Sequence, residues 1–334
     1  MADLTPIAVT SGEPAGIAPE ITGKAWSILR AKPECGFFLL GDADYWTARD
    51  LLGIRIRKIP SPGAATAVFA EALPVMHRPL AVHPAAGIIA AATAPQVIAA
   101  IDEAVELALA GAVSAIVTNP IHKQALHVAG FRHQGHTDYL AHLARRRGGD
   151  IHEVMMLVAK DLRAIPVTVH IPLAEVPRAL TAAAIVDQAR VVARDLTRYF
   201  GIARPRLAVT GLNPHAGENG TMGSEESDII MPALRRLAAE GIAVSGPLAA
   251  DSAFHAEARR HYDAILCMYH DQALIPVKTL DFHGGVNVSL GLPFIRTSPD
   301  HGTALGLAGT GQARPDSLIA AIELAARMAH AAGA

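Results

Sequence analysis

The segment from residue 268 to residue 304 carries an unusual number of side chains that could do chemistry. Between apolar runs and glycines it places imidazole, carboxylate, amide and cationic groups, at His270, Asp271, Lys278, Asn287, Arg296, Asp300 and His301. Burying a polar group costs free energy unless the group finds a partner, so an ordinary core segment would not contain so many. We therefore expect this segment to line a ligand site.

Three histidines could form a metal site. His170, His215 and His270 each lie at or just past the end of a predicted strand, at residues 164–169, 206–210 and 264–268. Ligands collect at the carboxyl ends of strands in open parallel sheets, and three neutral imidazoles suit Zn²⁺ or a similar divalent ion. Because the three are widely spaced and match no compact motif, the pattern also allows separate solvated or core histidines.

Basic and amide side chains of the same segment could bind an anion. Lys278, Asn287 and Arg296 recur at nine-residue intervals across an expected loop and strand. Lysine and arginine bind phosphate or carboxylate, arginine in a bidentate manner. Asn287 and Ser289 share one face of the expected strand at 286–290. Ordinary surface cations would give the same pattern, so both interpretations stay open here.

A further anion site could precede the helix predicted at 139–147. Gly135, His136, Thr137 and Asp138 lead into that helix, and Thr137 and Asp138 are good N-cap residues. The N–H groups of such a turn can hold an anion. Plain capping would explain the same residues without any ligand.

The order of apolar segments predicts an α/β fold. Short apolar strands alternate with longer helical patterns, which is typical of βαβ units and a largely parallel sheet. A chain of 334 residues is long for one core, so we expect two domains or one large α/β unit. Strands are expected at 7–10, 37–40, 114–118, 154–158, 164–169, 206–210, 264–268 and 286–290, and helices at 95–110, 185–199, 225–239 and 317–329.

Composition excludes several classes of partner and location. A net charge of −2 gives no electrostatic reason to expect nucleic acid or an anionic membrane surface as a partner. Cys35 and Cys267 lie in apolar strand-like runs, which favours buried free thiols and a reducing compartment. No signal peptide is visible, and no apolar run reaches the roughly 20 residues that a membrane span needs. We expect a soluble, cytoplasmic protein.

Several longer motifs together resemble the 4-hydroxythreonine-4-phosphate dehydrogenase family of vitamin B6 biosynthesis. The motifs occur in order through nearly the whole chain, at 11–20 (SGEPAGIAPE), 119–123 (NPIHK), 135–137 (GHT), 211–218 (GLNPHAGE), 268–272 (MYHDQ), 285–297 (GVNVSLGLPFIRT) and 300–304 (DHGTA). The resemblance implies the fold of the isocitrate and isopropylmalate dehydrogenases, with two α/β/α domains around a cleft. It also implies a homodimer with active sites at the subunit interface.

From the resemblance, the domain built from both chain ends should comprise residues 1–130 and 286–334, and the metal, substrate and dimerisation domain residues 131–285. His170, His215 and His270 are then the ligands of a divalent metal (Zn²⁺, Mg²⁺, Mn²⁺ or Co²⁺). The phosphorylated substrate is contacted by His136, Thr137, Lys278, Asn287 and Arg296. Lys278, Asp271 and Asp251 are the candidates for proton transfer.

The resemblance places NAD or NADP on the loop Asp300, His301, Gly302, Thr303 and Ala304, which fits the absence of a GxGxxG fingerprint. The implied reaction oxidises the C3 hydroxyl of 4-phosphooxy-L-threonine, and loss of CO₂ follows. Four positions depart from the family pattern. Glu13 and Ala18 are mild changes, whereas Pro299 and Gly306 affect the choice between NAD and NADP.

Three other functions remain to be separated from this one. A paralogue of the same family would oxidise another phosphorylated four-carbon acid or a cyclic dihydrodiol with the same histidines. A metal-dependent aldolase or lyase would use the metal and the anion pocket without a redox step. A non-catalytic binding protein would leave both sites idle.

Overall fold

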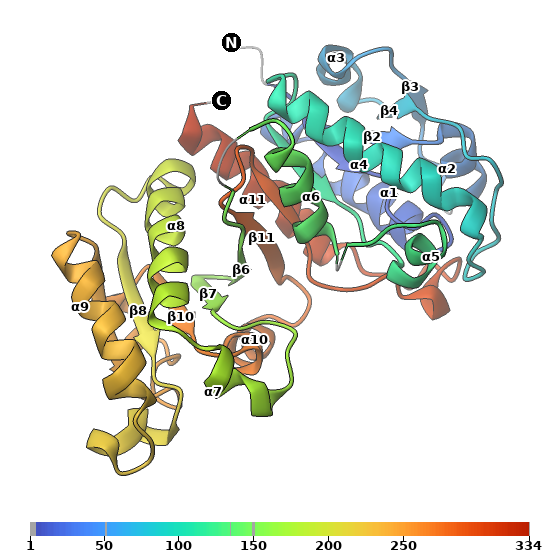
Figure 1. The fold of residues 1–334 in the computed structure, drawn as a ribbon. Helices are drawn as coiled ribbons and strands as arrows, with labels where there is room; N and C mark the ends of the chain where they lie inside the picture. Colours follow the sequence, from blue (N-terminus) through green and yellow to red (C-terminus); the bar gives the residue numbers. More distant parts are fainter. Residues whose placement is uncertain (1–4, 51, 134, 149–150, 334) are drawn as a thin grey trace. The chain divides into compact units, whose positions relative to one another are not determined.

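The computed structural model describes residues 5–50, 52–133, 135–148 and 151–333. Its contacts divide the chain into two compact units (Figure 1). Unit 1 comprises Met1–Ile151 and Leu292–Ala334, and unit 2 comprises His152–Gly291. The chain therefore leaves unit 1 once and returns to it for its last segment.

Unit 1 is built on a parallel sheet with the strand order β3-β4-β2-β1-β5-β12. The strands are β1 (Ile7–Thr10), β2 (Phe37–Gly41), β3 (Ile56–Lys58), β4 (Leu73–His77), β5 (Ala115–Thr118) and β12 (Arg296–Pro299). The three central strands, β2, β1 and β5, are buried along their whole length. Burial on both faces explains why these strands are continuous apolar runs rather than alternating ones.

Helices cover both faces of the unit 1 sheet. Ala8, Phe38 and Ile116 pack against α4 (Ala94–Leu109) and α6 (His136–Arg145). The alternate residues of each strand point to the other face, because side chains alternate along a strand. There α1 (Ala18–Leu29) and α11 (Asp316–Ala332) contact each other, and α11 contacts β5 and β12. The shorter helices are α2 (Ala43–Arg49), α3 (Ala65–Phe69) and α5 (Lys123–Val128).

Unit 2 has a mixed sheet with the order β11-β6-β7-β10-β8-β9. Its strands are β6 (Val154–Ala159), β7 (Leu162–Pro166), β8 (Arg206–Thr210), β9 (Ala243–Leu248), β10 (Ala264–Cys267) and β11 (Val286–Leu290). Strand β6 runs antiparallel to β7 and β11, and the others pair in parallel. The carboxyl ends of β7, β10 and β8 therefore lie side by side at one edge.

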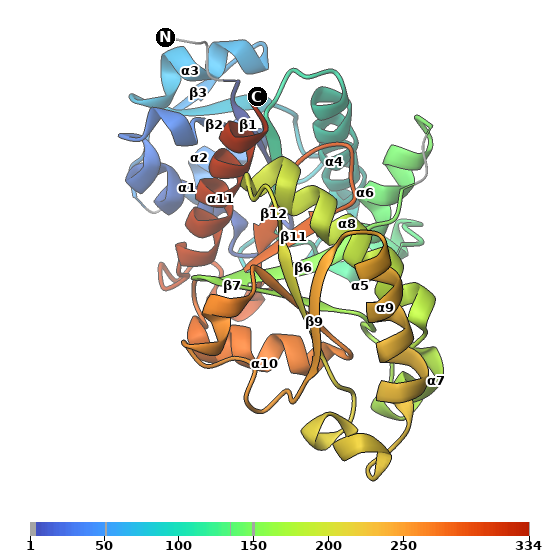
Figure 2. The same ribbon diagram turned by 90° about the vertical axis from the view of Figure 1, so that its left-hand side faces the viewer.

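The helices of unit 2 pack as two groups. The long helix α8 (Ala182–Phe200) packs beside α9 (Met231–Ala239), which also contacts β9 (Figure 2). Helix α10 (His270–Leu280) buries Ala273 and Val277 against strands β6, β7 and β10. A short helix, α7 (Val176–Ala179), follows β7 and precedes α8 along the chain. In the part of the chain that the structure describes, no helix has the length and apolar character needed to cross a bilayer.

The predicted α/β class is confirmed, and most of the predicted strands agree with the structure to within a few residues. Strands β3, β4, β9 and β12 were not predicted. β3 and β9 are largely solvent-accessible, so they lack the apolar run on which strand prediction depends. The prediction that Lys278 lies in a loop is wrong, because it belongs to the last turn of α10. Pro276 inside that helix hid the helical pattern.

Candidate active site

Two of the predicted metal ligands face each other at the carboxyl edge of the unit 2 sheet. His170 follows β7, and His270 is the first residue of α10, directly after β10. Their ring centroids are 5.5 Å apart at an interplanar angle of 45°. Both rings line a cavity of about 330 Å³ together with Thr168, Tyr269 and Asp271. This edge of the sheet therefore gathers polar side chains around a hollow, as expected for parallel strand ends.

Buried hydrogen bonds fix the strand ends that carry these rings. The amide of Gln272 accepts from the Met268 N–H (2.8 Å) and the Thr210 hydroxyl (2.9 Å), and it donates to the Gly211 carbonyl (2.8 Å). The Thr168 hydroxyl donates to the Met268 carbonyl at 2.8 Å. The ends of β7 and β8 are thus both bonded to the segment 268–272, which carries His270, and Thr168 lies two residues before His170.

His215 lies on the neighbouring strand end, in the turn Pro214–Gly220 after β8. Its backbone is left-handed, with φ of 53°, and so is that of Gly217, with φ of 78°. The buried carboxylate of Glu226 holds this turn by accepting from the N–H groups of Leu212 and Asn213, both at 2.8 Å. Burial acts to raise the pKa of Glu226, but these and further hydrogen bonds outweigh it and leave the pKa below its usual value.

The three histidines do not converge on one point within a single chain. Their ligand atoms do not all lie within 4.8 Å of one another, and His215 does not line the cavity of His170 and His270. The Nδ1 atom of His270 lies 2.8 Å from an oxygen of Asp271. A carboxylate in this position fixes the ring and leaves Nε2 for a ligand, as in many carboxylate–histidine–metal arrangements.

The remaining predicted residues of unit 2 lie on different elements. Lys278 is half-buried on α10, with its ammonium 5.4 Å from the ring centroid of Phe282. Asn287 lies on β11 and has a buried Oδ1 without a hydrogen-bond partner among the described residues. Asp251 is exposed in the turn after β9. An amide oxygen that is buried and unsatisfied is a natural place for a polar ligand.

In unit 1 the structure brings His136 and Arg296 together. Arg296 is 3% exposed, and it donates to the Thr118 hydroxyl at 2.7 Å. Burial lowers the pKa of the Arg296 guanidinium to about 9, so it stays charged at neutral pH. Burial, and then the positive charges of Arg296 and Lys123, hold the pKa of His136 well below its usual value. His136 is therefore a neutral imidazole beside two cations.

The predicted N-cap residues of helix α6 are wrong. Helix α6 begins at His136 and its N-cap is Gly135, so Thr137 and Asp138 belong to the first turn rather than to the cap. Glycine offers no side chain to accept from the first N–H groups, and no side-chain cap is present. This helix start is consequently better suited to an external anion than the sequence alone indicated.

The predicted cofactor loop follows β12 in unit 1. The Thr303 carbonyl accepts from the Ile17 N–H at 3.1 Å, and the Asp300 N–H donates to the Ser317 hydroxyl at 2.9 Å. A side chain at Gly16 would place its Cβ 2.8 Å from the Thr303 oxygen. The motif at 11–20 therefore packs directly on the loop 300–304, which explains why it carries glycine at position 16.

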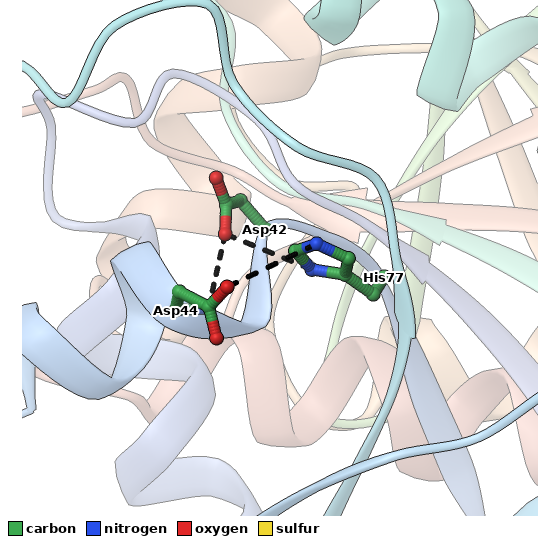
Figure 3. Close-up of side chains that lie close together, drawn as sticks. All are labelled: Asp42, Asp44 and His77. Atoms are coloured by element: carbon green, nitrogen blue, oxygen red, sulfur yellow. Dashed lines mark hydrogen bonds and ion pairs between the residues drawn. The ribbon is translucent and has the colours of Figure 1, made fainter.

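Sequence reasoning missed a compact acidic cluster in unit 1. Asp42, Asp44 and His77 each offer a potential metal-binding atom, and these atoms lie within 4.8 Å of one another (Figure 3). Asp42 is the N-cap of α2, and its Oδ1 accepts from the N–H groups of Asp44 (3.0 Å) and Tyr45 (3.2 Å). The strand-then-aspartate pattern before α2 is a cap signal that sequence reasoning could have used.

Donors of the protein already occupy most of the lone pairs that Asp42 and His77 could offer to a metal. The second oxygen of Asp42 accepts from the Leu80 N–H at 2.8 Å and lies 3.0 Å from His83 Nε2. Nδ1 of His77 accepts from the Ala43 N–H at 3.2 Å. Asp44 is exposed and pairs with Lys58. We therefore interpret the cluster as a helix cap with a surface ion pair, and not as the catalytic metal site.

Comparison with known proteins agrees with the motifs. Residues 33–325 match the family model described as "Pyridoxal phosphate biosynthetic protein PdxA". The 4-hydroxythreonine-4-phosphate dehydrogenase of Caulobacter vibrioides is 52% identical over 98% of both chains, and that of Bradyrhizobium diazoefficiens is 51% identical over 98% of this chain and 97% of its own. A crystal structure of the Klebsiella pneumoniae enzyme of that name has a TM-score of 0.88 and 40% identity, covering 97% of this chain and 99% of its own.

The capping interpretation of Asp42 predicts a stability effect that a metal site would not give. Asp42→Ala should lower the free energy of unfolding by about 1–2 kcal/mol, because α2 loses its cap. Asp44→Ala removes only a surface ion pair and should cost less than about 1 kcal/mol. Urea unfolding of the two variants and the wild type measures both effects.

The pH dependence of the same measurement follows from the pKa of Asp42. Burial acts to raise this pKa, but the hydrogen bonds from Leu80, Tyr45, His83 and Asp44 bring it below the usual 3.8. A carboxyl whose pKa is lower in the folded state stabilises above its usual pKa and stops doing so as pH falls through the folded value. The wild-type advantage over Asp42→Ala should therefore shrink below pH 3.8. Equal losses in both variants, restored by a divalent cation, would contradict the cap.

Proposed function

Because this chain belongs to the family of the pyridoxal phosphate biosynthetic protein PdxA, we propose that it oxidises 4-phosphooxy-L-threonine at the C3 hydroxyl. The product loses CO₂ to give 3-amino-2-oxopropyl phosphate, and NAD or NADP accepts the hydride. The chain is an oxidoreductase acting on CH–OH groups, as its relatives are. The observation that carries the proposal is the facing pair His170 and His270 beside Asp271 at one strand edge.

We assign a divalent metal to His170, His215 and His270. Imidazole ligands suit Zn²⁺, Co²⁺ and related ions, and a set of three leaves coordination positions for a substrate. When bound, such an ion acts as a Lewis acid that lowers the pKa of a coordinated hydroxyl. The hydrogen bond between His270 and Asp271 supports the assignment, because it fixes the tautomer of a ligating ring.

The chain's own residues supply substrate binding and proton transfer. His136, Thr137 and Arg296 of unit 1, and Lys278 and Asn287 of unit 2, are the proposed substrate contacts. Since Asp271 is engaged by His270, Lys278 and Asp251 are the stronger candidates for taking the hydroxyl proton. The loop 300–304, packed on the motif at 11–20, is the proposed site for NAD or NADP.

We further propose a homodimer that completes the metal site. His170 and His270 lie together in one chain while His215 lies outside their cavity, so a second copy is the natural source of the third ligand. Large apolar side chains are exposed on unit 2 around these segments, among them Leu173 (69%), Ile275 (64%) and Phe282 (68%). Exposed apolar area of this kind marks association surfaces.

The proposed location is the cytoplasm. Cys35 and Cys267 are both buried and both free. Burial raises the pKa of the Cys35 thiol to about 11 and also raises that of Cys267, so both stay protonated and unreactive. Free structural thiols fit a reducing compartment.

The substrate proposal predicts NADH or NADPH formation on mixing the metal-loaded protein with 4-phosphooxy-L-threonine and the oxidised nucleotide. Absorbance at the reduced-nicotinamide band measures turnover. His215→Ala and treatment with EDTA should each abolish the signal, while circular dichroism shows an unchanged fold. Reconstitution of stripped protein with Zn²⁺, Mg²⁺, Mn²⁺ or Co²⁺ in turn identifies the active metal.

The same assay separates the alternatives. A paralogue would turn over 4-phosphoerythronate or a cyclic dihydrodiol in preference to 4-phosphooxy-L-threonine. An aldolase or lyase would consume a substrate without reducing the nucleotide. Absence of turnover on 4-phosphooxy-L-threonine with every metal would overturn the proposed substrate.

The shared metal site predicts complementation between inactive variants. In a mixed dimer of His170→Ala and His215→Ala, one of the two sites keeps an intact His170–His270 pair and an intact partner His215. Mixing the two inactive proteins, after partial unfolding and reassembly, should therefore restore about a quarter of wild-type activity, since half of random dimers are mixed and each mixed dimer has one good site.

A mixture of His170→Ala and His270→Ala is the matched control. These two residues belong to the same half of the site, so no combination of the two subunits rebuilds it and activity should stay absent. Recovery in neither mixture would show that each chain builds its site alone.

A further inference from the structure

Lys123 is held in a fixed place by the loop that follows β5. Gly12 has a left-handed φ of 64°, and a Cβ there would lie 2.6 Å from the Cβ of Asn119, so the loops after β1 and β5 touch. The Glu13 N–H donates to the Pro120 carbonyl at 2.8 Å. His122 then caps α5 by accepting from the Ala125 N–H at 3.3 Å. Lys123 is the first residue of α5 and projects from this anchored turn.

The side chain of Lys123 reaches the start of helix α6. A Cβ built on Gly135 would lie 3.5 Å from Lys123 Cε and 3.7 Å from its Nζ. The ammonium makes no hydrogen bond or ion pair to any residue within the described ranges. A lysine drawn against a helix N-terminus is unfavourable by itself, because the helix dipole is positive at that end.

Two more donors belong to this region of unit 1. His136 follows Gly135, and its Nε2 is inaccessible to solvent without a hydrogen-bond partner among the described residues. Arg296, which is almost fully buried, is close enough to His136 to act on its charge state, as Lys123 is. The ammonium of Lys123 and the unsatisfied Nε2 of His136 therefore lie at one positive helix end, and Arg296 adds a second cation to the surroundings of His136.

We propose that Lys123 is a specificity residue whose ammonium binds the phosphoryl group of the substrate, together with His136 and Arg296. The inference rests on the proposed function, in which the substrate is phosphorylated. A phosphoryl dianion suits the pocket better than a carboxylate does, because it matches two cations in charge and offers three acceptor oxygens to three donors. Gly135 has no side chain, so it leaves the space beside the Lys123 ammonium unfilled.

The first test measures binding of inorganic phosphate by isothermal titration calorimetry, without substrate, metal or nucleotide. Lys123→Ala should weaken phosphate binding by about tenfold to a hundredfold, which is the usual worth of a charge-assisted hydrogen bond. Lys123→Arg should keep most of the affinity because it keeps the charge. Gln124→Ala, on the same helix, and Arg57→Gln, which removes an exposed positive charge on β3, should bind phosphate as the wild type does.

The second test compares kcat/KM for 4-phosphooxy-L-threonine and for unphosphorylated 4-hydroxythreonine. Lys123→Ala should raise KM for the phosphorylated substrate by about tenfold to a hundredfold and leave the low kcat/KM for the unphosphorylated one unchanged. An equal loss on both substrates would mean that Lys123 binds the carboxylate or acts only through the fold, and it would overturn the proposal. Unchanged phosphate affinity in Lys123→Ala would overturn it as well.

The two tests distinguish failure of the Lys123 proposal from failure of the proposed function. If the wild type does not oxidise 4-phosphooxy-L-threonine at all, the proposed function is wrong, and the calorimetric comparison still decides whether Lys123 forms a phosphate site. If the wild type is active and Lys123→Ala binds phosphate normally, the proposed function stands and the role of Lys123 is wrong.

Discussion

The buried amide of Gln272 is the contact on which the geometry of the unit 2 site depends. It bonds to the end of β10 through the Met268 N–H and to the end of β8 through Thr210 and Gly211. A glutamine side chain can make these three bonds at once only when the strand ends keep one separation and one orientation. His270 lies on the same helix start, and His215 lies on the turn that leaves Gly211. Gln272 therefore fixes the positions of the two chain segments that lead to His270 and His215.

The structural and the functional polar clusters of this chain differ in how far the protein's own groups satisfy them. The carboxylates of Asp42 and Glu226 are saturated by N–H donors of their own loops, so their hydrogen bonds serve the fold. The cluster of Lys123, His136 and Arg296 differs, because it gathers donors and positive charge near the start of α6. The imidazoles of His170 and His270 likewise face a hollow. The Nε2 of His136, which is buried without a hydrogen-bond partner among the described residues, is a donor for which an external ligand has to be sought.

Sequence reasoning succeeded where one local pattern decides the structure. The central strands β1, β2, β5 and β10 are buried on both faces, so their apolar runs are unambiguous. It failed where the structure depends on neighbours distant in sequence, as for the exposed strand β3 and for α10 with its internal Pro276. It named the histidines, Arg296 and the loop at 300–304, since their types are distinctive. It included Lys123 and Gln272 in the motifs at 119–123 and 268–272 but gave them no role, because their significance comes from partners brought near by folding.

Titration with Co²⁺ tests most directly the claim that the catalytic metal lies on histidines of unit 2. The ligand-field absorption of Co²⁺ reports its coordination, and we expect about one tightly bound ion per chain with a band typical of a low-coordinate site containing nitrogen. Each of His170→Ala, His215→Ala and His270→Ala should lose that band, and Asp44→Ala should keep it. Retention of the band in the three histidine variants, with loss in Asp44→Ala, would show that the metal binds at Asp42, Asp44 and His77 and not at the histidines of unit 2.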